Sequence, residues 1–218
     1  MEVPYRDRAP APRWLLVVAL VAAALSGIAI VTVDQPLARF LAQYRPLAIW
    51  DHVMGSLEWA VGLQLIPWTS GIALVLALLV TLAVPRWRRE VPAWMFVAAV
   101  HLLSRIAMVE IKDLTGRLRP LEWLQRGGDE TFGWVNGISY PSGHVVLFAS
   151  LVIPLAVLVP RTRPLLAVAA FVMAARLAVN AHFASDVIGA ITLVTLVAWA
   201  ASVAIRPLRT ERPRASRR

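Results

Sequence analysis

The sequence predicts an all-α fold, a polytopic membrane bundle of about six transmembrane helices. Hydrophobic residues make up 59% of the 218 residues and charged residues only 16%, a composition too apolar for a soluble domain. The apolar residues are gathered in long runs, and a run of about 20 such residues spans a bilayer as a helix. Composition and run length therefore place the chain in a membrane.

Six apolar segments are long enough, or nearly so, to form these helices. The first two carry no charged residue, whereas the third holds several ionisable residues and the fifth holds Arg176. The fourth is short, so we expect its helix to begin near Ser142 or to continue past Pro160. The segments are 14–33, 63–84, 91–111, 145–159, 164–181 and 187–205.

The first segment follows three arginines, as the apolar core of a secretory signal does. Its apolar run continues to Val33, which is longer than the roughly 7 to 15 residues of a usual signal core. The sequence therefore favours a retained first helix that follows a short N-terminal segment, residues 1–13.

Positive charges predict the orientation of the helices, because short cytoplasmic loops collect Lys and Arg. With both termini in the cytoplasm, fourteen of the 22 Lys and Arg residues fall in cytoplasmic segments and six in outer segments. We therefore expect both termini to be cytoplasmic and the loop from Lys112 to His144 to lie outside the cell membrane. The Arg-rich tail, residues 206–218, is expected to anchor this topology by touching anionic lipid.

The net charge of +9 would also suit a nucleic-acid-binding protein, but such proteins carry Lys and Arg on a soluble basic face. Here these residues lie between apolar runs, so we expect membrane lipids and no nucleic acid as partners. Cysteine is absent, which excludes disulfides and thiolate metal sites.

Three polar clusters lie at segment ends that this topology brings to one face of the membrane. The first spans residues 112–120 after the third segment, and the second, residues 141–144 (Pro-Ser-Gly-His), opens the fourth. The third consists of Arg176, His182 and Asp186 at the turn between the fifth and sixth segments. Their convergence predicts one shared site.

The cations and the helix start in these clusters suit a phosphate ester. Arg119 and Arg176 can present planar guanidinium groups to pairs of phosphate oxygens, while Lys112 supplies a compact positive charge. Ser142 and Gly143 add a hydroxyl and exposed backbone N–H groups at a helix N-terminus, where anions bind readily.

Two histidines supply the nucleophile and the general acid that a two-step phosphoryl transfer needs. His182 and Asp186 are four residues apart, so on one helix the carboxylate would keep one ring nitrogen protonated while the other attacks phosphorus. His144 lies beside the phosphate-binding turn and is the candidate acid. Taken singly, most of these residues have ordinary structural explanations; Arg176, within a span, is the exception.

The order and spacing of these residues resemble the three-part signature of the type-2 phosphatidic acid phosphatase (PAP2) family. Six residues separate Lys112 from Arg119, the Pro-Ser-Gly-His turn follows, and five residues separate Arg176 from His182. One position departs from the pattern, because Ala175 stands where the family usually has serine. We expect this change to tune affinity or substrate choice without abolishing activity.

The resemblance implies a membrane lipid phosphatase domain over residues 14–205 that works through a phosphohistidine intermediate and needs no metal or other cofactor. In the family, the first two motifs and the arginine of the third bind phosphate, one histidine attacks, the other is the acid, and the aspartate orients the nucleophile. The implied phosphate-binding residues are Lys112, Arg119, Ser142, Gly143 and Arg176. The implied catalytic residues are His182, His144 and Asp186.

The substrate remains open among lipid phosphates and diphosphates such as undecaprenyl diphosphate, phosphatidylglycerophosphate and phosphatidic acid. A lipid phosphotransferase would share the intermediate, and a non-catalytic lipid-binding or transport relative would share the fold. The same pocket would accept vanadate, as in the related haloperoxidases, but those proteins are soluble. The oligomeric state is left open as well.

Outside the motifs, a stripe from His101 through Arg105 to Lys112 runs along one face of the third segment and is predicted to face protein. We expect Arg105 and Glu110 to form ion pairs within the bundle. The aromatic residues of the loop 122–140 are expected to form an interfacial belt rather than a lid.

Overall fold

The structure, a computed structural model, describes residues 13–128 and 134–210, with the backbone alone for residues 206–210. The described ranges contain nine α-helices, two short 3-10 helices and no strand. The predicted all-α helical bundle is therefore confirmed. The segments 1–12 and 211–218, which hold most of the predicted cytoplasmic ends, lie outside the described residues.

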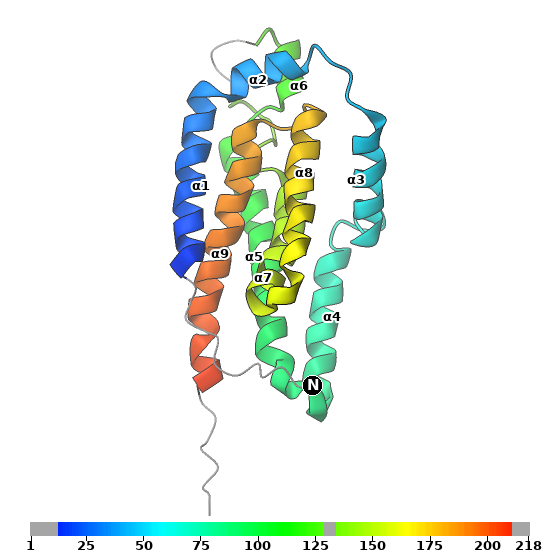
Figure 1. Ribbon diagram of the computed structural model, residues 1–218, viewed down its shortest axis with the longest axis vertical. Coiled ribbons are helices and arrows are strands. Elements are labelled where there is room, and N and C mark those ends of the chain that lie inside the picture. Colours follow the sequence, from blue (N-terminus) through cyan, green and yellow to red (C-terminus); the bar gives the residue numbers. More distant parts are fainter. Residues whose placement is uncertain (1–12, 129–133, 211–218) are drawn as a thin grey trace, which may run out of the picture.

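Each of the six predicted segments contains a helix, and these helices run side by side along the bundle (Figure 1). Three spans, Arg13–Thr32, Pro85–Thr115 and Ala184–Ile205, are long and apolar enough to cross a membrane, and two further apolar helices are shorter. The chain is thus a membrane protein by its helices as well as by its composition. The six helices are α1 (Arg13–Thr32), α4 (Thr69–Ala83), α5 (Val91–Thr115), α7 (Gly143–Leu158), α8 (Leu166–Ala178) and α9 (Ala184–Thr210).

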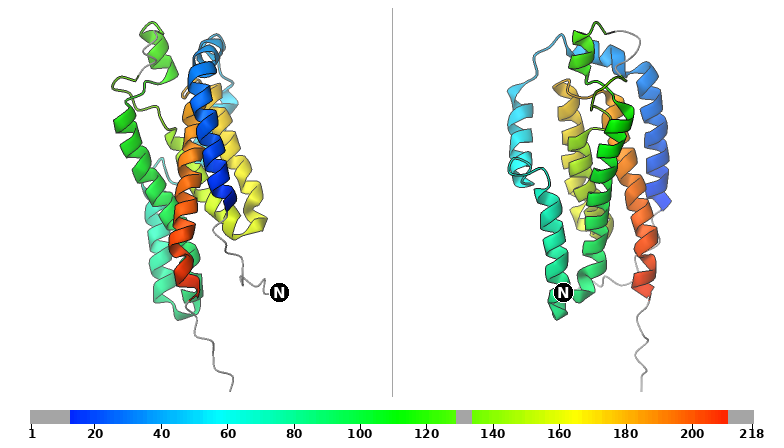
Figure 2. Two further views of the ribbon diagram at one scale, coloured as in Figure 1. Left: turned by 90° about the vertical axis from the view of Figure 1, so that its left-hand side faces the viewer. Right: turned by 180° about the vertical axis from the view of Figure 1, so that it is seen from behind.

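The core of the bundle forms around α7, which is apolar on every side and therefore packs against several neighbours. Val145, Val146 and Ala149 of α7 are completely buried, as are Val172 of α8 and Val194 of α9. On the outside, α1 and α4 leave many large apolar side chains exposed, as expected of helices that face lipid tails. Figure 2 shows α1 packed along α9 on one side of the bundle.

The fourth predicted segment begins its helix at Gly143, directly after Ser142, which confirms the predicted start near Ser142, and the helix ends at Leu158, before Pro160. The second segment differs from the prediction, because its helix begins only at Thr69. Gly62 has φ +71°, and a Cβ at this position would clash with the side chain of Thr69. Pro67 lacks the N–H that a helix interior requires, so residues 63–68 form turns.

Three helices were not predicted: α2 (Asp34–Leu41), α3 (Ala48–Ala60) and α6 (Pro120–Gln125). In Figure 1, α3 lies above α4 on the same side of the bundle, so that the two together line most of its height. Helix α3 packs against α8, and α2 and α6 lie together over the end of the bundle.

The two ends of the bundle carry different elements. The end of α5, the start of α7 and the turn from α8 to α9 lie at one end (Figure 1). The 3-10 helix η1 (Pro85–Glu90) and the described end of α9 lie at the other, and the start of α1 and the 3-10 helix η2 (Pro160–Leu165) are turned toward that end. Helix α9 continues beyond the predicted end of its span at Ile205.

Two expectations outside the motifs do not hold as made, the second of them at Trp123. Arg105 lies over the ring of Trp68, 4.5 Å from its centroid, Glu110 is exposed, and neither forms an ion pair with another described residue. Trp123 is only 1% exposed and packs edge-on against Phe183, so it does not belong to an interfacial aromatic belt. Phe132 of the same loop lies outside the described residues.

Candidate active site

The three predicted clusters meet at the end of the bundle where α5 finishes and α7 and α9 begin. Lys112 lies in the last turn of α5, residues 142–144 open α7, and Arg176 lies in the last turn of α8. Backbone contacts join the motifs directly, since the N–H of Ser142 donates to the carbonyl oxygen of Asp186 at 3.0 Å. The structure thus brings together all eight residues that the motif pattern selected.

His182 lies in the turn before α9 and is 3% exposed. Its Nδ1 is 3.4 Å from Oδ2 of Asp186 and 3.3 Å from the hydroxyl of Ser139, which itself donates to the same carboxylate oxygen at 2.6 Å. With the proton on Nδ1, facing these two acceptors, Nε2 keeps its lone pair. The arrangement leaves one ring nitrogen of His182 available as a nucleophile.

Burial lowers the pKa of His182 from its ordinary value near 6.5 to about 4, because the charged imidazolium is disfavoured away from water. Asp186 opposes this effect, while the charges of Arg176 and Lys112 add to it. The ring is therefore neutral at neutral pH, and only a neutral imidazole has a lone pair with which to attack.

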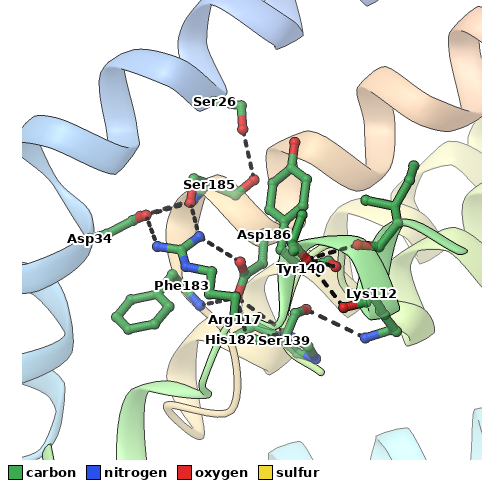
Figure 3. A network of polar contacts seen from close by, with 12 residues as sticks. Ser26, Asp34, Lys112, Arg117, Ser139, Tyr140, His182, Phe183, Ser185 and Asp186 are labelled. Atoms are coloured by element: carbon green, nitrogen blue, oxygen red, sulfur yellow. Dashed lines mark hydrogen bonds and ion pairs between the residues drawn. The ribbon is translucent and has the colours of Figure 1, made fainter. Parts of the chain in front are cut away.

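A buried ionic network holds Asp186 in place (Figure 3). Arg117 is entirely buried, and it donates from Nη1 to Asp186 and from Nη2 to Asp34, each at 2.7 Å. Ser185 joins the network, because its backbone N–H donates to Asp34 at 2.9 Å and its hydroxyl contacts the same carboxylate. The guanidinium of Arg117 also lies over the ring of Phe183 at 4.3 Å.

The network connects the first two helices to the candidate nucleophile. Asp34 begins α2, and Ser26 of α1 donates to the carbonyl oxygen of Ser185 at 3.0 Å. Because buried charges are costly unless they are paired and hydrogen-bonded, the two carboxylates and one guanidinium hold one another in place. The position of Asp186 therefore depends on residues far from it in the sequence.

His144 has a different partner. Its Nε2 lies 2.9 Å from Oε1 of Glu58, near the end of α3, and Oε2 of Glu58 accepts a hydrogen bond from Gln64 at 2.5 Å. Arg119 and Arg176 also interact electrostatically with His144. The second histidine is thus held by one carboxylate in a cationic surrounding.

Three of the predicted phosphate-binding residues have a buried polar atom without a hydrogen-bond partner among the described residues. These atoms are Nε of Arg119, Oγ of Ser142 and Nε of Arg176. Unpaired buried donors cost free energy, and an anion that accepts from them would relieve this cost. Arg119 and Arg176 repel one another, which a bound anion would also relieve.

Close backbone packing sets the relative positions of the first two motifs. A Cβ on Gly143 would lie 3.3 Å from the sulfur of Met108 and 3.9 Å from Cε of Lys112, so α7 begins in direct contact with α5. The ammonium of Lys112 donates to the carbonyl oxygen of Ile138 and approaches that of Ser139 at 3.5 Å. Lys112 is therefore held beside the site by the loop that precedes α7.

Ala175, where the family pattern usually has serine, is completely buried in the main apolar core. Sequence reasoning missed four residues that hold the site together: Asp34, Glu58, Arg117 and Ser139. The only signal for them is that Asp34 and Arg117 are ionisable residues next to apolar segments, where charge is costly unless paired.

Comparisons with known proteins identify the family. The PAP2 superfamily model matches residues 93–209, which is more than half of the 218 residues and includes all three clusters. No curated protein and no solved structure matched the chain. Asp34 and Glu58 lie outside the matched range. Given the extent of this match, the chain belongs to the PAP2 superfamily, which indicates phosphatase or phosphotransferase activity on phosphorylated substrates.

Proposed function

We propose that this protein is a membrane lipid phosphatase that transfers the phosphoryl group of a lipid phosphate or diphosphate to His182 and then to water. The observation that carries the proposal is the set of unpartnered buried atoms on Arg119, Ser142 and Arg176, beside two histidines that each contact a carboxylate. A phosphate group supplies the acceptor oxygens that these three donors lack.

In the proposed first step, Nε2 of His182 attacks phosphorus and the bond to the leaving oxygen breaks. Lys112, Arg119 and Arg176 stabilise the charge on the non-bridging oxygens, together with Ser142 and the backbone N–H groups at the start of α7. His144 protonates the leaving oxygen. In the second step, His144 takes a proton from water, which attacks phosphorus and releases inorganic phosphate from His182.

The lipid nature of the substrate is supported by the membrane setting and by the place of the site at one end of the bundle. There a lipid tail can stay among the helices' apolar surfaces while the head group reaches His182. The positive-charge count favours the extracytoplasmic side of the cell membrane for this end.

The test is phosphate release from undecaprenyl diphosphate, phosphatidylglycerophosphate and phosphatidic acid by the full chain in detergent, with His182→Ala beside it. We expect release from at least one lipid and none above background from His182→Ala, with the variant's melting temperature close to the parent's. A fully active His182→Ala would reject the mechanism. Transfer to an added acceptor lipid in place of water would assign a phosphotransferase, and a folded parent that consumes no lipid would assign a non-catalytic relative.

A further inference from the structure

Glu58 contacts the candidate general acid although it lies outside every motif and outside the range that matches the family. Its side chain is 17% exposed and that of His144 is 27% exposed, so the contact is partly accessible to solvent. Glu58 lies near the end of α3, in a stretch for which the sequence offered no motif. Gln64, in the turns after α3, holds the second carboxylate oxygen.

We propose that Glu58 is a positioning residue that orients His144 and favours its protonated form for its role as general acid. The proposal rests on the proposed function, since it assigns a part to Glu58 in the same reaction. The proposed role depends on one contact, in which Oε1 of Glu58 lies 2.9 Å from Nε2 of His144.

The contact determines which ring nitrogen delivers the proton. Nε2–H donates to Glu58, and among the described residues Nδ1 of His144 has no hydrogen-bond partner. When the ring is protonated, Nδ1 therefore carries a proton that is free to move to a leaving oxygen. The carboxylate on the far side of the ring fixes its orientation, as carboxylates do for catalytic histidines generally.

Electrostatics give Glu58 a second task. The charged groups that act on His144 are Arg176 from α8, Arg119 from the start of α6, and Glu58 from α3. Burial, Arg176 and Arg119 lower the pKa of His144 below its ordinary value near 6.5, and Glu58 is the one carboxylate in this set that opposes them. A general acid must start the reaction protonated, so a site crowded with cations for phosphate binding needs a carboxylate next to the acid.

The chemical step balances around this pair. As Nε2 of His182 forms its bond to phosphorus, the bond from phosphorus to the leaving oxygen breaks, and that oxygen takes the proton from Nδ1 of His144. The ring of His144 becomes neutral and keeps its Nε2–H on Glu58. In the second step Nδ1 takes a proton from the attacking water, which restores the imidazolium beside Glu58.

The experiment compares Glu58→Gln with the parent on two leaving groups, a short-chain phosphatidic acid and 4-nitrophenyl phosphate. An alkoxide needs a proton as it leaves, whereas 4-nitrophenolate does not, so a defect in general acid catalysis appears mainly with the lipid. We expect the first-turnover rate on the phosphatidic acid, measured by rapid quench, to fall at least about tenfold and the first-turnover release of 4-nitrophenol to fall less than about threefold. First turnovers are compared because hydrolysis of the phosphohistidine, which also uses His144, is common to both substrates. In a His144→Ala background, Glu58→Gln should have no further effect.

Asp51→Asn is the matched control, because Asp51 lies on the same helix, carries the same charge and acts on Arg176, but does not contact His144. It should leave the ratio of the two rates unchanged. Gln64→Leu keeps the charge of Glu58 and removes its second hydrogen bond, so it should give a smaller loss with the same dependence on the leaving group. This variant tests the proposal independently if Glu58→Gln folds poorly.

An equal loss on both substrates, or no loss on either, would overturn the proposal while leaving the proposed function intact. A lower KM with unchanged kcat would overturn it too, because Glu58 would then act as a charge that repels the substrate. An inactive parent, or a fully active His182→Ala, would instead reject the proposed function, and the role of Glu58 with it.

Discussion

The two histidines of the site are held in contrasting ways. His182 is buried, and Asp186, Ser139, Arg117 and Asp34 form a continuous buried network beside it. His144 is 27% exposed and contacts one carboxylate, supplied by Glu58 on a helix at the side of the bundle. The difference suits the proposed roles, because the nucleophile must stay neutral and fixed, whereas the acid must exchange protons with the leaving group and water.

The contrast also shows that the two histidines depend on different parts of the chain. The nucleophile depends on α1 and α2, which supply Ser26 and Asp34, and the acid depends on α3. Both parts precede the range that matches the family. The helices before the matched range are therefore expected to position the two histidines as well as to lie in the membrane.

The largest effect is expected from breaking the network behind His182. Arg117→Met leaves Asp34 and Asp186 as buried charges without their shared partner, which lowers the free energy of unfolding by about 3–5 kcal/mol. Unfolding in detergent micelles by denaturant measures this loss. Arg39→Met is the control, since Arg39 is exposed, donates to the carbonyl oxygen of Gly128 and lies over the ring of Trp123 without pairing a buried charge, and it should cost far less. Equal losses in both variants would show that the network does not support the fold.

Removal of the acid is expected to spare the nucleophile. His144→Ala should lower kcat on a lipid phosphate by about 10²–10⁴-fold, the usual contribution of a general acid or base. The release of 4-nitrophenol in the first turnover should fall far less, because that leaving group needs no proton. Stopped-flow absorbance measures this turnover, and an equal loss on both substrates would contradict the assignment of His144 as the acid.

A smaller effect is expected at the phosphate-binding turn. Ser142→Ala removes a buried hydroxyl that has no partner among the described residues, so the unliganded protein should be as stable as the parent or more so. Binding of inorganic phosphate should weaken by about 10- to 100-fold, the value of one hydrogen bond to a charged group. Competitive inhibition by phosphate and thermal unfolding measure the two effects, and unchanged inhibition would place Ser142 outside the phosphate site.

The mildest perturbation is a change of pH. Because burial lowers the pKa of His182 to about 4, its ring should stay neutral from pH 8 to about pH 5 and become protonated only as the pH falls through about 4. NMR of ¹⁵N-labelled histidine in micelles follows this directly, and with four histidines in the chain, His182→Ala assigns the signal. A titration midpoint near 6.5 would mean that water reaches the ring.

The sequence predicted the fold well where one physical effect dominates. Continuous apolar runs located a helix in each of six segments, because an α-helix satisfies its own backbone hydrogen bonds inside a bilayer. The sequence did not predict the helices within residues 34–60, where α2 and α3 contain polar residues and are stabilised by contacts with distant elements. It also placed the start of α4 too early, because the left-handed backbone of Gly62 interrupts an apolar run.

In the site, the spacing of the motifs selected residues that the fold brings together, because each motif lies at the end of a helix. The supporting residues were beyond reach, because their partners are distant in the sequence. Asp34 lies 83 positions from Arg117, and Glu58 lies 86 positions from His144. Such pairs follow from the packing of α2 and α3, which no local pattern encodes.

The central claim, that phosphate is carried by His182 and released with the help of His144, is tested most directly by trapping the intermediate. His144→Ala given 4-nitrophenyl phosphate should release one equivalent of 4-nitrophenol quickly and then stall, because the second step lacks its base. Mass spectrometry after a rapid quench at alkaline pH should then find phosphate on His182, and none in His182→Ala. A burst without phosphate on His182, or phosphate on another residue, would contradict the account.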